Sequence, residues 1–355
     1  MPDLVVAGAG MAGLAAAAQA RSLGADVLLL EKGEHAGGSM LLSSGVIWRH
    51  RELEHFHTEC PDGDRALQRL VWERMDGDIS WLESLGVRVL GRETGNPRTT
   101  GTRFDTRSLA RCLTEAAGGR VHLRAALREP PADGTPVVLA TGGFQADREL
   151  VREHVTPEAD ALLLRAAPWS EGDGLRIGLS AGGRASAGLG EFYGRNMPAP
   201  PARVEPEGFV ELAQLYARHA EVENTRGEHF ETRTWSEIDA VQWTARQPGA
   251  RARYRVAREM LEERVRERSV GEMIAAAERA GAPVRRENGA IVVECVAGIT
   301  TTLGGLAIDG SARVAPGVFA CGADAGGIAT GGYASGLAAA LVFGRIAATA
   351  ALEAA

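Results

Sequence analysis

Three glycines near the start of the chain have the spacing of a phosphate-binding turn. The segment reads Gly8-Ala-Gly10-Met-Ala-Gly13, it follows the apolar run of residues 4–7, and Glu31 lies 18 residues after Gly13. In such a turn the first glycine allows the tight bend, the second lets backbone approach a pyrophosphate, and the third lets the helix pack on the strand. The positive end of the helix attracts the anion. The spacing therefore predicts a dinucleotide site, with Glu31 binding the adenosine ribose hydroxyls.

A second glycine-rich cluster indicates how long the dinucleotide is. The first turn does not distinguish NAD from FAD, because both present the same ADP half to it. After Glu31 and Lys32 the chain continues with Gly37-Gly38-Ser39 and Ser43-Ser44-Gly45, which suit the extended remainder of a longer cofactor. Further glycine clusters occur at residues 140–143, 172–174 and 322–336. Together these clusters favour FAD.

Apolar runs and glycine breaks outline the elements that position these clusters. We expect strands at residues 4–7, 27–30, 121–123, 137–140 and 318–321, and helices at residues 11–23, 65–85, 109–117, 172–183, 251–268 and 335–351. A strand, a helix and a strand in succession at the N-terminus make a βαβ unit. The sequence therefore predicts an α/β, Rossmann-like fold.

A change in composition indicates an inserted domain. Residues 196–206 are proline-rich, the following segment to residue 294 has few glycines and many arginines and glutamates, and glycine-rich sequence resumes at Gly298. Residues 251–268 alternate arginine with glutamate, which indicates a salt-bridged exposed face. We expect a discontinuous FAD-binding domain at residues 1–197 and 296–355, with a smaller, shortened α+β cap domain inserted at residues 198–295.

The composition excludes several reaction classes. All but one of the 39 basic residues are arginines, and Lys32 stands in neither a Schiff-base nor a phosphate-loop context. The cysteines lie far apart without C-x-x-C spacing, so we expect isolated buried thiols and no metal site. They are Cys60, Cys112, Cys295 and Cys321. The net charge of −7 argues against nucleic acid as a partner.

The N-terminal residues do not match a signal peptide. Asp3 stands where basic residues are required, and glycines interrupt the apolar run of residues 1–20. We expect no membrane-spanning stretch and a soluble, cytoplasmic protein. Its expected partners are a small-molecule substrate and an electron acceptor that the sequence leaves unknown, with no nucleic acid and no membrane, and the oligomeric state stays open.

Ordered motifs extend over nearly the whole chain. They read VVAGAGMAGLAAA with LLLEKGEHAGGSM, VVLATGGF, EGDGLRIGLSAGGR, GITTTLGGLAID, and VFACGADAGG with SGLAAALVFGRIAA, with a looser match at NTRGEHF. In this order they resemble the FAD-binding flavoproteins of the succinate dehydrogenase and fumarate reductase family, whose relatives include ketosteroid and tricarballylate dehydrogenases. The resemblance implies an FAD-binding domain with an inserted cap.

The resemblance also implies where FAD binds. It places Ala12 and the glycines at the pyrophosphate, residues 39–45 along the flavin, and the start of the last helix at the N1 and O2 edge of the flavin. The expected cofactor residues are Gly8, Gly10, Met11, Ala12, Gly13, Glu31, Lys32, Gly38, Ser39, Met40, Ser43, Ser44, Gly45, Thr141, Gly142, Gly143, Asp173, Gly322, Ala323, Asp324, Ser335, Gly336 and Leu337. Because Met40 or Leu41 stands where some relatives have an attaching histidine, we expect noncovalent FAD.

The substrate half departs from the fumarate reductase pattern at three positions. Thr300 stands in place of a substrate-binding histidine, and Tyr333 in place of a substrate-binding arginine. Glu237 stands in place of the arginine that delivers the proton. These replacements argue against fumarate or succinate as the substrate.

The turn Tyr333-Ala-Ser-Gly336 looks comparable to a Tyr-Ala-Gly turn of ketosteroid dehydrogenases, where the hydroxyl polarises a carbonyl. We predict Tyr333 as a catalytic donor, with Tyr193, Arg195 or Tyr216 completing the site. A tyrosine that only packs against the flavin is the alternative. The predicted activity is an FAD-dependent oxidoreductase acting on a CH–CH bond next to a carbonyl or carboxyl group, with hydride exchanged at flavin N5. A flavin oxidase or monooxygenase using oxygen, and a flavin-binding protein with a decayed substrate site, stay open.

Overall fold

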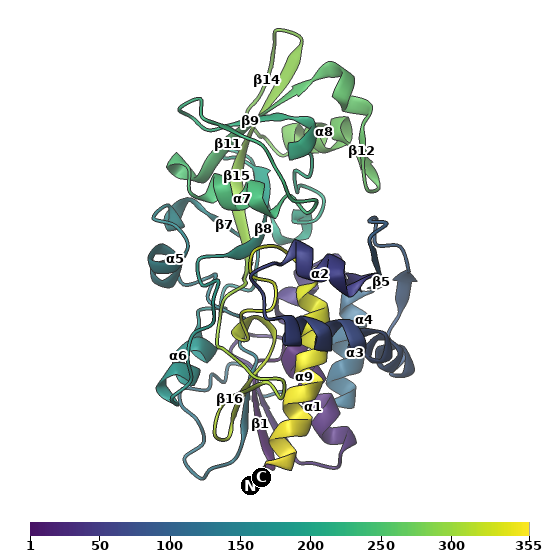
Figure 1. Ribbon diagram of the computed structural model, residues 1–355, viewed down its shortest axis with the longest axis vertical. Helices are drawn as coiled ribbons and strands as arrows, with labels where there is room; N and C mark the ends of the chain where they lie inside the picture. The colour runs from purple at the N-terminus through teal and green to yellow at the C-terminus, as the bar shows by residue number, and fades with distance from the viewer. Residues whose placement is uncertain (355) are drawn as a thin grey trace. The chain divides into compact units, whose positions relative to one another are not determined.

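The computed structural model describes residues 1–354, which fall into two units (Figure 1). Unit 1 contains Met1–Asp147, Ala166–Glu191 and the chain from Thr301 onward, and unit 2 contains Arg148–Arg165 and Phe192–Thr300. These limits differ from the expected domain limits, because residues 148–165, 192–197 and 296–300 belong to unit 2. Two short strands in those segments pair with the long strand of unit 2, an interaction that local sequence does not show.

A five-stranded sheet forms the centre of unit 1. Its strands are β1 (Leu4–Ala7), β2 (Val27–Leu30), β6 (Val137–Leu139), β16 (Arg313–Ala315) and β17 (Val318–Ala320). The order is β16-β17-β6-β1-β2, and β17, β6, β1 and β2 run parallel. The strands β1, β6 and β17 are buried at every position, which explains why their residues are all apolar. The α/β, Rossmann-like fold class is confirmed.

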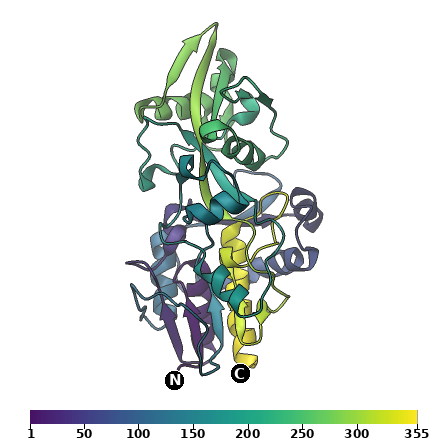
Figure 2. The ribbon, with the colours of Figure 1, turned by 90° about the vertical axis from the view of Figure 1, so that its left-hand side faces the viewer.

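Helices and a small second sheet complete unit 1 (Figure 2). The helices are α1 (Met11–Ser22), α2 (Leu53–Glu59), α3 (Arg65–Ser84), α4 (Thr106–Ala116), α6 (Asp173–Ser180) and α9 (Gly336–Glu353), with the short 3-10 helices η1 (Gly38–Leu42) and η7 (Gly322–Asp324). The second sheet contains β3 (Val46–His50), β4 (Val89–Gly91) and β5 (Thr99–Phe104) in the order β3-β5-β4. Residues 121–123 were expected to form a strand, which is wrong, because only His122 makes a bridge to Leu30.

Helix α9 packs closely against α1, and both helices are rich in small side chains. A Cβ at Gly344 would lie 2.4 Å from the carbonyl oxygen of Ala12, so only glycine allows this approach. Among the described residues, α9 alone is long and apolar enough to cross a membrane by length and composition. Because Leu341 and Phe343 are fully buried in the core of unit 1, its apolar character is also that of a core helix.

A seven-stranded sheet organises unit 2. Its strands are β7 (Leu163–Leu164), β8 (Phe192–Pro198), β9 (Glu221–Glu223), β10 (His229–Phe230), β11 (Arg251–Ala257), β14 (Val284–Glu287) and β15 (Ala290–Thr302). The order is β10-β9-β11-β15-β14, and β7 and β8 also pair with β15. The helices are α5 (Arg148–His154), α7 (Ile238–Ala245) and α8 (Val270–Arg279), and the strands β12 (Arg264–Val265) and β13 (Arg268–Ser269) form a hairpin. Short 3-10 helices occur at Ala159–Ala161, Pro206–Gly208, Ala217–His219, Pro248–Ala250 and Arg258–Glu262.

The charged segment of residues 251–268 is not the expected helix. Ala252, Tyr254 and Val256 are buried and alternate with arginines, which is the two-residue period of the strand β11. The arginines nevertheless form the expected salt-bridged face, since Arg251 pairs with Glu294 and Arg255 with Glu287. Helices and strands can both be rich in arginine and glutamate. Only the spacing of the buried residues therefore distinguishes a strand from a helix here.

A buried histidine lies among aromatic rings beside β3. His50 is 4% exposed, its ring centroid lies 5.3 Å from that of Trp48 and 5.4 Å from that of Phe56, and neither ring nitrogen has a hydrogen-bond partner within the described structure. Burial, together with the charges of His55 and Arg98, lowers the pKa of His50 from 6.5 to about 4. The imidazole is therefore neutral in the folded protein at neutral pH.

Replacing His50 by phenylalanine will stabilise the protein in mild acid. The unfolded chain binds a proton near pH 6.5 and the folded chain only near pH 4, so the stability contributed by neutral His50 is lost as pH falls through this range. At pH 5 the loss is about 2 kcal/mol. Urea unfolding of wild type and His50→Phe between pH 4 and 7.5 will show a difference that widens toward acid. A pH-independent difference would contradict this assignment.

Candidate functional site

The first glycine turn lies at the carboxyl end of β1 and opens α1. Gly8 has a φ of +103°, and a Cβ there would lie 2.1 Å from the carbonyl oxygen of Ala140. A Cβ at Gly13 would lie 1.8 Å from the carbonyl oxygen of Gly8, whereas nothing lies within 4 Å of a Cβ at Gly10. Gly10 caps α1 without a side-chain hydrogen bond. The helix start is therefore open above Gly10, which fits a pyrophosphate in van der Waals contact with the backbone.

The second glycine cluster lies against this turn. The N–H of Gly37 donates to the carbonyl oxygen of Ala9 at 2.7 Å, and a Cβ at Gly38 would lie 3.4 Å from the Cα of Gly10. The hydroxyl of Ser43 donates to the carbonyl oxygen of Met40 and accepts from the N–H of Gly45. The structure thus joins segments that the sequence separates by a helix and a strand, and it places both clusters at one edge of the sheet.

Two further segments meet at the same edge. Asp324 is buried, and its carboxylate accepts hydrogen bonds from the N–H and hydroxyl of Thr141 and from the N–H of Gly143. Burial raises the pKa of Asp324 although these hydrogen bonds oppose the shift. A Cβ at Gly322 would lie 2.9 Å from that of Ala12, and one at Gly143 would lie 3.1 Å from the Cβ of Ala323. The sequence predicted that Asp324 contacts the cofactor. It did not predict the hydrogen bonds that Asp324 accepts from Thr141 and Gly143.

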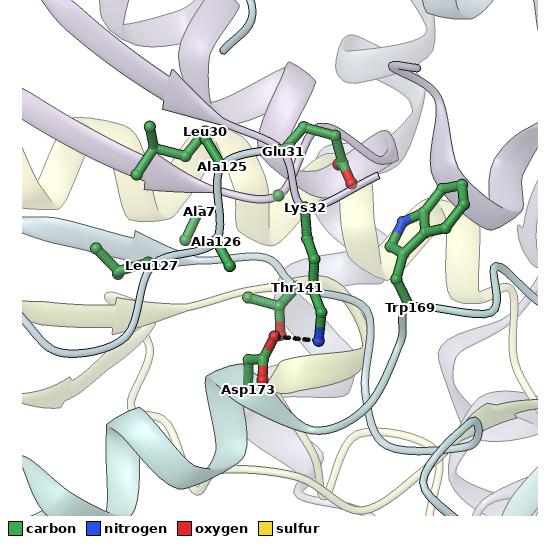
Figure 3. Close-up of a pocket in the computed structure, with 11 residues that line it drawn as sticks. Ala7, Leu30, Glu31, Lys32, Ala125, Ala126, Leu127, Thr141, Trp169 and Asp173 are labelled. Atoms are coloured by element: carbon green, nitrogen blue, oxygen red, sulfur yellow. Dashed lines mark hydrogen bonds and ion pairs between the residues drawn. The ribbon is translucent and has the colours of Figure 1, made fainter. Parts of the chain in front are cut away.

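A pocket opens beside the first turn, at the ends of β1 and β2 (Figure 3). It is lined by Ala7, Gly8, Leu30, Glu31, Lys32, Ala125, Ala126, Leu127, Thr141, Trp169 and Asp173. Five of these were expected as cofactor residues. Trp169 and residues 125–127 were missed, because no periodicity or motif marks them and only the fold brings them to this edge.

Two charged side chains of this pocket are held by neighbouring groups. The carboxylate of Glu31 accepts the N–H groups of Ala9 and Gly33, both at 2.7 Å, and is 4% exposed. The ammonium of Lys32 lies 2.7 Å from a carboxylate oxygen of Asp173 and 2.6 Å from one of Glu171 (Figure 3 shows the pair with Asp173). Glu31 therefore braces the glycine turn, and its contact with a ribose stays a prediction.

Tyr333 and the start of α9 also belong to unit 1. The Ser335 hydroxyl caps α9 by accepting from the N–H of Ala338, and it accepts from the N–H of Trp48 at 3.4 Å. The ring of Tyr333 meets that of Trp48 edge-on, with centroids 5.7 Å apart. Ser335 therefore ties the helix start to β3, and Tyr333 lies two residues before it.

The other predicted catalytic residues lie in unit 2. Tyr193 and Arg195 stand two residues apart on β8, and the Arg195 guanidinium lies 5.1 Å from the centroid of the Tyr193 ring. Tyr216, by contrast, is fully buried in the core of unit 2 and donates its hydroxyl hydrogen to Gln214. Burial raises the pKa of Tyr216 well above 10. Tyr216 is therefore a packing residue of this core.

Glu237, which stands in place of the expected arginine, is buried in unit 2. It is 7% exposed, and its carboxylate accepts the N–H groups of Ala217 and Arg218. The Arg195 guanidinium donates to the carbonyl oxygen of Ser236, the neighbouring residue. Arg195 of β8 therefore contacts the residue next to Glu237, the glutamate that replaces the expected arginine.

The chain matches the FAD binding domain family over residues 3–134 and 132–337. These ranges cover most of its length, and the chain belongs to this family. The glycine turns and the open helix start described above lie within them.

Two named relatives match about half of the chain. The identity is 27% over 243 residues with the vinyl phenol reductase of Lactiplantibacillus plantarum, covering 56% of this chain and 49% of that protein. It is 25% over 228 residues with a cytochrome-type fumarate reductase of Shewanella frigidimarina, covering 51% of this chain and 40% of that protein. The chain thus spans half or less of the length of these relatives.

Solved structures share the fold over the whole chain. A 3-ketosteroid Δ1-dehydrogenase from Sterolibacterium denitrificans superposes with a TM-score of 0.75 at 15% identity, covering 100% of both chains. The open conformation of a flavocytochrome c3 fumarate reductase gives 0.72 at 20% identity, covering 99% of this chain and 78% of that one. At these identities the likeness establishes the fold.

Proposed function

We propose that the chain is an FAD-dependent oxidoreductase that forms or reduces a carbon–carbon double bond next to a carbonyl or carboxyl group of a small molecule. The open helix start at Gly10, within a chain of the FAD binding domain family, carries the proposal. Two relatives are named after vinyl phenol and fumarate, and each of these compounds contains a carbon–carbon double bond. Met40 and Leu41 offer no attaching nucleophile, so the cofactor is held noncovalently.

The residues of unit 1 fit FAD at both of its ends. The N–H groups at the start of α1 would hold the pyrophosphate, and the pocket beside Glu31 and Lys32 would receive the adenosine. Ser39, Met40 and the start of α9 would lie along the flavin. When bound, FAD supplies hydride exchange with a substrate carbon.

Tyr333 of unit 1 has the proposed substrate role, and Tyr193 and Arg195 of unit 2 stay predicted catalytic residues. The Tyr333 hydroxyl donates to the substrate carbonyl oxygen and stabilises the negative charge that develops there. Thr300, at the position of a histidine in fumarate reductases, accepts a hydrogen bond from Arg165 at 2.9 Å. The replacements at residues 237, 300 and 333 argue against a dicarboxylate, and we propose a substrate with one carbonyl or carboxyl group.

Anaerobic reduction of bound flavin tests this function. The purified protein is loaded with FAD and mixed with saturated ketones and carboxylic acids, and in the reverse direction its reduced form is mixed with enones and unsaturated acids. Bleaching or return of the flavin absorbance with one chemical class supports the proposal. Reoxidation by air within seconds, with peroxide formed and no response to an unsaturated acceptor, would favour an oxidase. A flavin that no donor reduces would indicate binding without turnover.

Replacing Tyr333 by phenylalanine will slow flavin reduction by about 100-fold and leave FAD affinity unchanged. The substitution removes one hydrogen-bond donor to a developing oxyanion. It keeps the ring that packs on Trp48, so the fold is retained. Stopped-flow reduction and a flavin titration measure the two quantities. Equal reduction rates in both proteins would show that Tyr333 only packs.

A further inference from the structure

Among the described residues that line the pocket at the ends of β1 and β2, Trp169 alone is aromatic (Figure 3). All of these residues belong to unit 1. The other walls combine alanine and leucine side chains with a few polar groups, and Gly8 of the first glycine turn is among the lining residues. A mainly apolar pocket with one aromatic ring suits a flat heteroaromatic ligand. Its place beside the turn points to the base of a dinucleotide.

The indole of Trp169 packs on protein at one side and faces the pocket at the other. A Cβ at Gly33 would lie 2.3 Å from Cε2 and Cζ2 of the indole and 2.9 Å from Cδ2, so the Gly33 backbone packs against the face of the ring. The His35 ring meets the indole edge-on, with centroids 5.5 Å apart. Neither Gly33 nor His35 lines the pocket. Figure 3 shows the indole nitrogen on the side toward Glu31 and Lys32.

Ion pairs and a backbone hydrogen bond fix the segment that carries Trp169. The ammonium of Lys32 bridges the carboxylates of Glu171 and Asp173, at 2.6 and 2.7 Å. The N–H of Glu171 donates to the carbonyl oxygen of Trp169 at 3.0 Å. Residue 169 is thus tied to the end of β2, and its ring is in place before a ligand binds. A side chain that is already ordered lowers the entropic cost of binding.

The end of β2 also holds the apolar wall of residues 125–127. The N–H of Ala125 donates to the carbonyl oxygen of Glu31 at 2.9 Å, and the N–H of Arg124 donates to that of Gly33 at 3.0 Å. Gly33 therefore contacts both walls, the aromatic one through its Cα and the apolar one through its carbonyl oxygen. A change at Gly33 that moves the indole can leave the backbone hydrogen bonds of this residue in place.

We propose that Trp169 binds the adenine of FAD by packing its indole against the base, and that Gly33 is a positioning residue that lets the indole reach this place. Contact between a base and an aromatic side chain raises affinity by about 5- to 150-fold, and it tolerates exchange of one aromatic ring for another. This role of Trp169 rests on the proposed function, because it requires FAD as the cofactor. It adds the side chain that binds the end of FAD away from the flavin.

Titration with ADP tests the role of Trp169 without flavin or substrate. ADP is the half of FAD that contains adenine. We expect ADP to quench tryptophan fluorescence in the FAD-free wild type but not in Trp169→Phe, where the quenched indole is absent. By calorimetry, Trp169→Phe will keep the ADP affinity within about 3-fold, whereas Trp169→Leu will lower it by about 30-fold. Equal affinity in wild type and Trp169→Leu, or quenching that survives in Trp169→Phe, would overturn the proposal.

Trp72→Leu is the matched control for the loss of an indole. Trp72 lies on α3 in unit 1, is half-buried like Trp169, and does not line the pocket. Its indole N–H donates to the carbonyl oxygen of His50 at 2.9 Å. We expect Trp72→Leu to keep both the ADP affinity and the quenching by ADP. A loss of ADP affinity in Trp72→Leu as large as that in Trp169→Leu would mean that the effect is general destabilisation, and would overturn the proposal.

Gly33→Ala moves the indole from a residue outside the pocket. The added Cβ will displace the Trp169 ring and lower ADP affinity by about 10-fold. In the double variant Gly33→Ala, Trp169→Leu, the change at residue 33 will cost no further affinity, because the ring that it displaces is gone. Additive losses would show that residue 33 acts independently of Trp169, and would overturn its positioning role.

FAD titration and flavin reduction separate this role of Trp169 from the proposed function. FAD that binds wild type and Trp169→Leu with equal affinity removes the role of Trp169 and leaves the function standing. FAD that binds through Trp169 but is reduced by no donor supports that role and removes the function. A wild type that binds neither ADP nor FAD removes both.

Discussion

Replacing Gly10 by alanine will weaken FAD binding by about 1,000-fold and leave the fold intact. The backbone there has φ −80° and ψ −168°, which alanine adopts without strain, and the added Cβ meets nothing within 4 Å. The methyl group instead fills the space that the pyrophosphate needs, so two or more charge-assisted hydrogen bonds to the helix start are lost. Each contributes about 1.5–3 kcal/mol. Flavin fluorescence titration gives the affinity, and thermal unfolding of the FAD-free protein gives the stability.

Two other glycines are matched controls for this substitution. Gly77 lies on the exposed face of α3 with nothing within 4 Å of an added Cβ, so Gly77→Ala will leave FAD affinity unchanged and stabilise the helix by up to about 1 kcal/mol. At Gly13 an added Cβ would meet the Gly8 carbonyl oxygen at 1.8 Å, so Gly13→Ala will lower both stability and FAD affinity. Unchanged FAD affinity in Gly10→Ala would show that the pyrophosphate does not bind at the start of α1.

The parallel sheet and its glycine turns were predictable because local sequence determines them. The runs at residues 4–7 and 137–139 are apolar at every position, as strands buried on both faces must be. The glycines of the first turn follow from backbone geometry, since Gly8 needs a positive φ and Gly13 a close approach. The backbone accepts only glycine at such positions, so the requirement can be recognised in the sequence.

The charged strand β11 shows where local patterns are ambiguous. Its arginines and glutamates are equally common on helices, and the alternating Ala252, Tyr254 and Val256 mark the strand only once it is known to face a core. The pairing of β11 with β15 supplies that core. The pairing of β11 with β15 therefore determines that this segment is a strand, which its composition alone does not show.

The site residues that sequence reasoning missed act through contacts between distant segments. Trp169 and residues 125–127 line the pocket beside Glu31, although no motif marks them. Arg165 is one of many arginines in the chain, and only the pairing of β7 with β15 brings it to Thr300. No spacing rule connects residues that meet only across a sheet.

Replacing Asp78 by alanine will strongly destabilise the protein, because Asp78 on α3 forms a buried ion pair with Arg345 on α9. Asp78 is 3% exposed, and the Arg345 guanidinium also donates to Gln19 at 2.8 Å and lies 4.4 Å from the Trp81 ring centroid. Asp78→Ala leaves this cation without its carboxylate. Removing one partner of a buried pair costs about 3–5 kcal/mol. Urea unfolding at neutral pH measures the loss.

Removing both charges together will recover most of that loss. Burial raises the pKa of Asp78 even though Arg345 and Arg74 oppose the shift, so removing the carboxylate from water costs more than the ion pair returns. The second carboxylate oxygen also has no hydrogen-bond partner among the described residues. The double variant Asp78→Leu, Arg345→Met will therefore lie within about 1 kcal/mol of the wild type. Additive losses in the double variant would instead mean that each side chain stabilises the α3–α9 contact by its own packing and not through the pair.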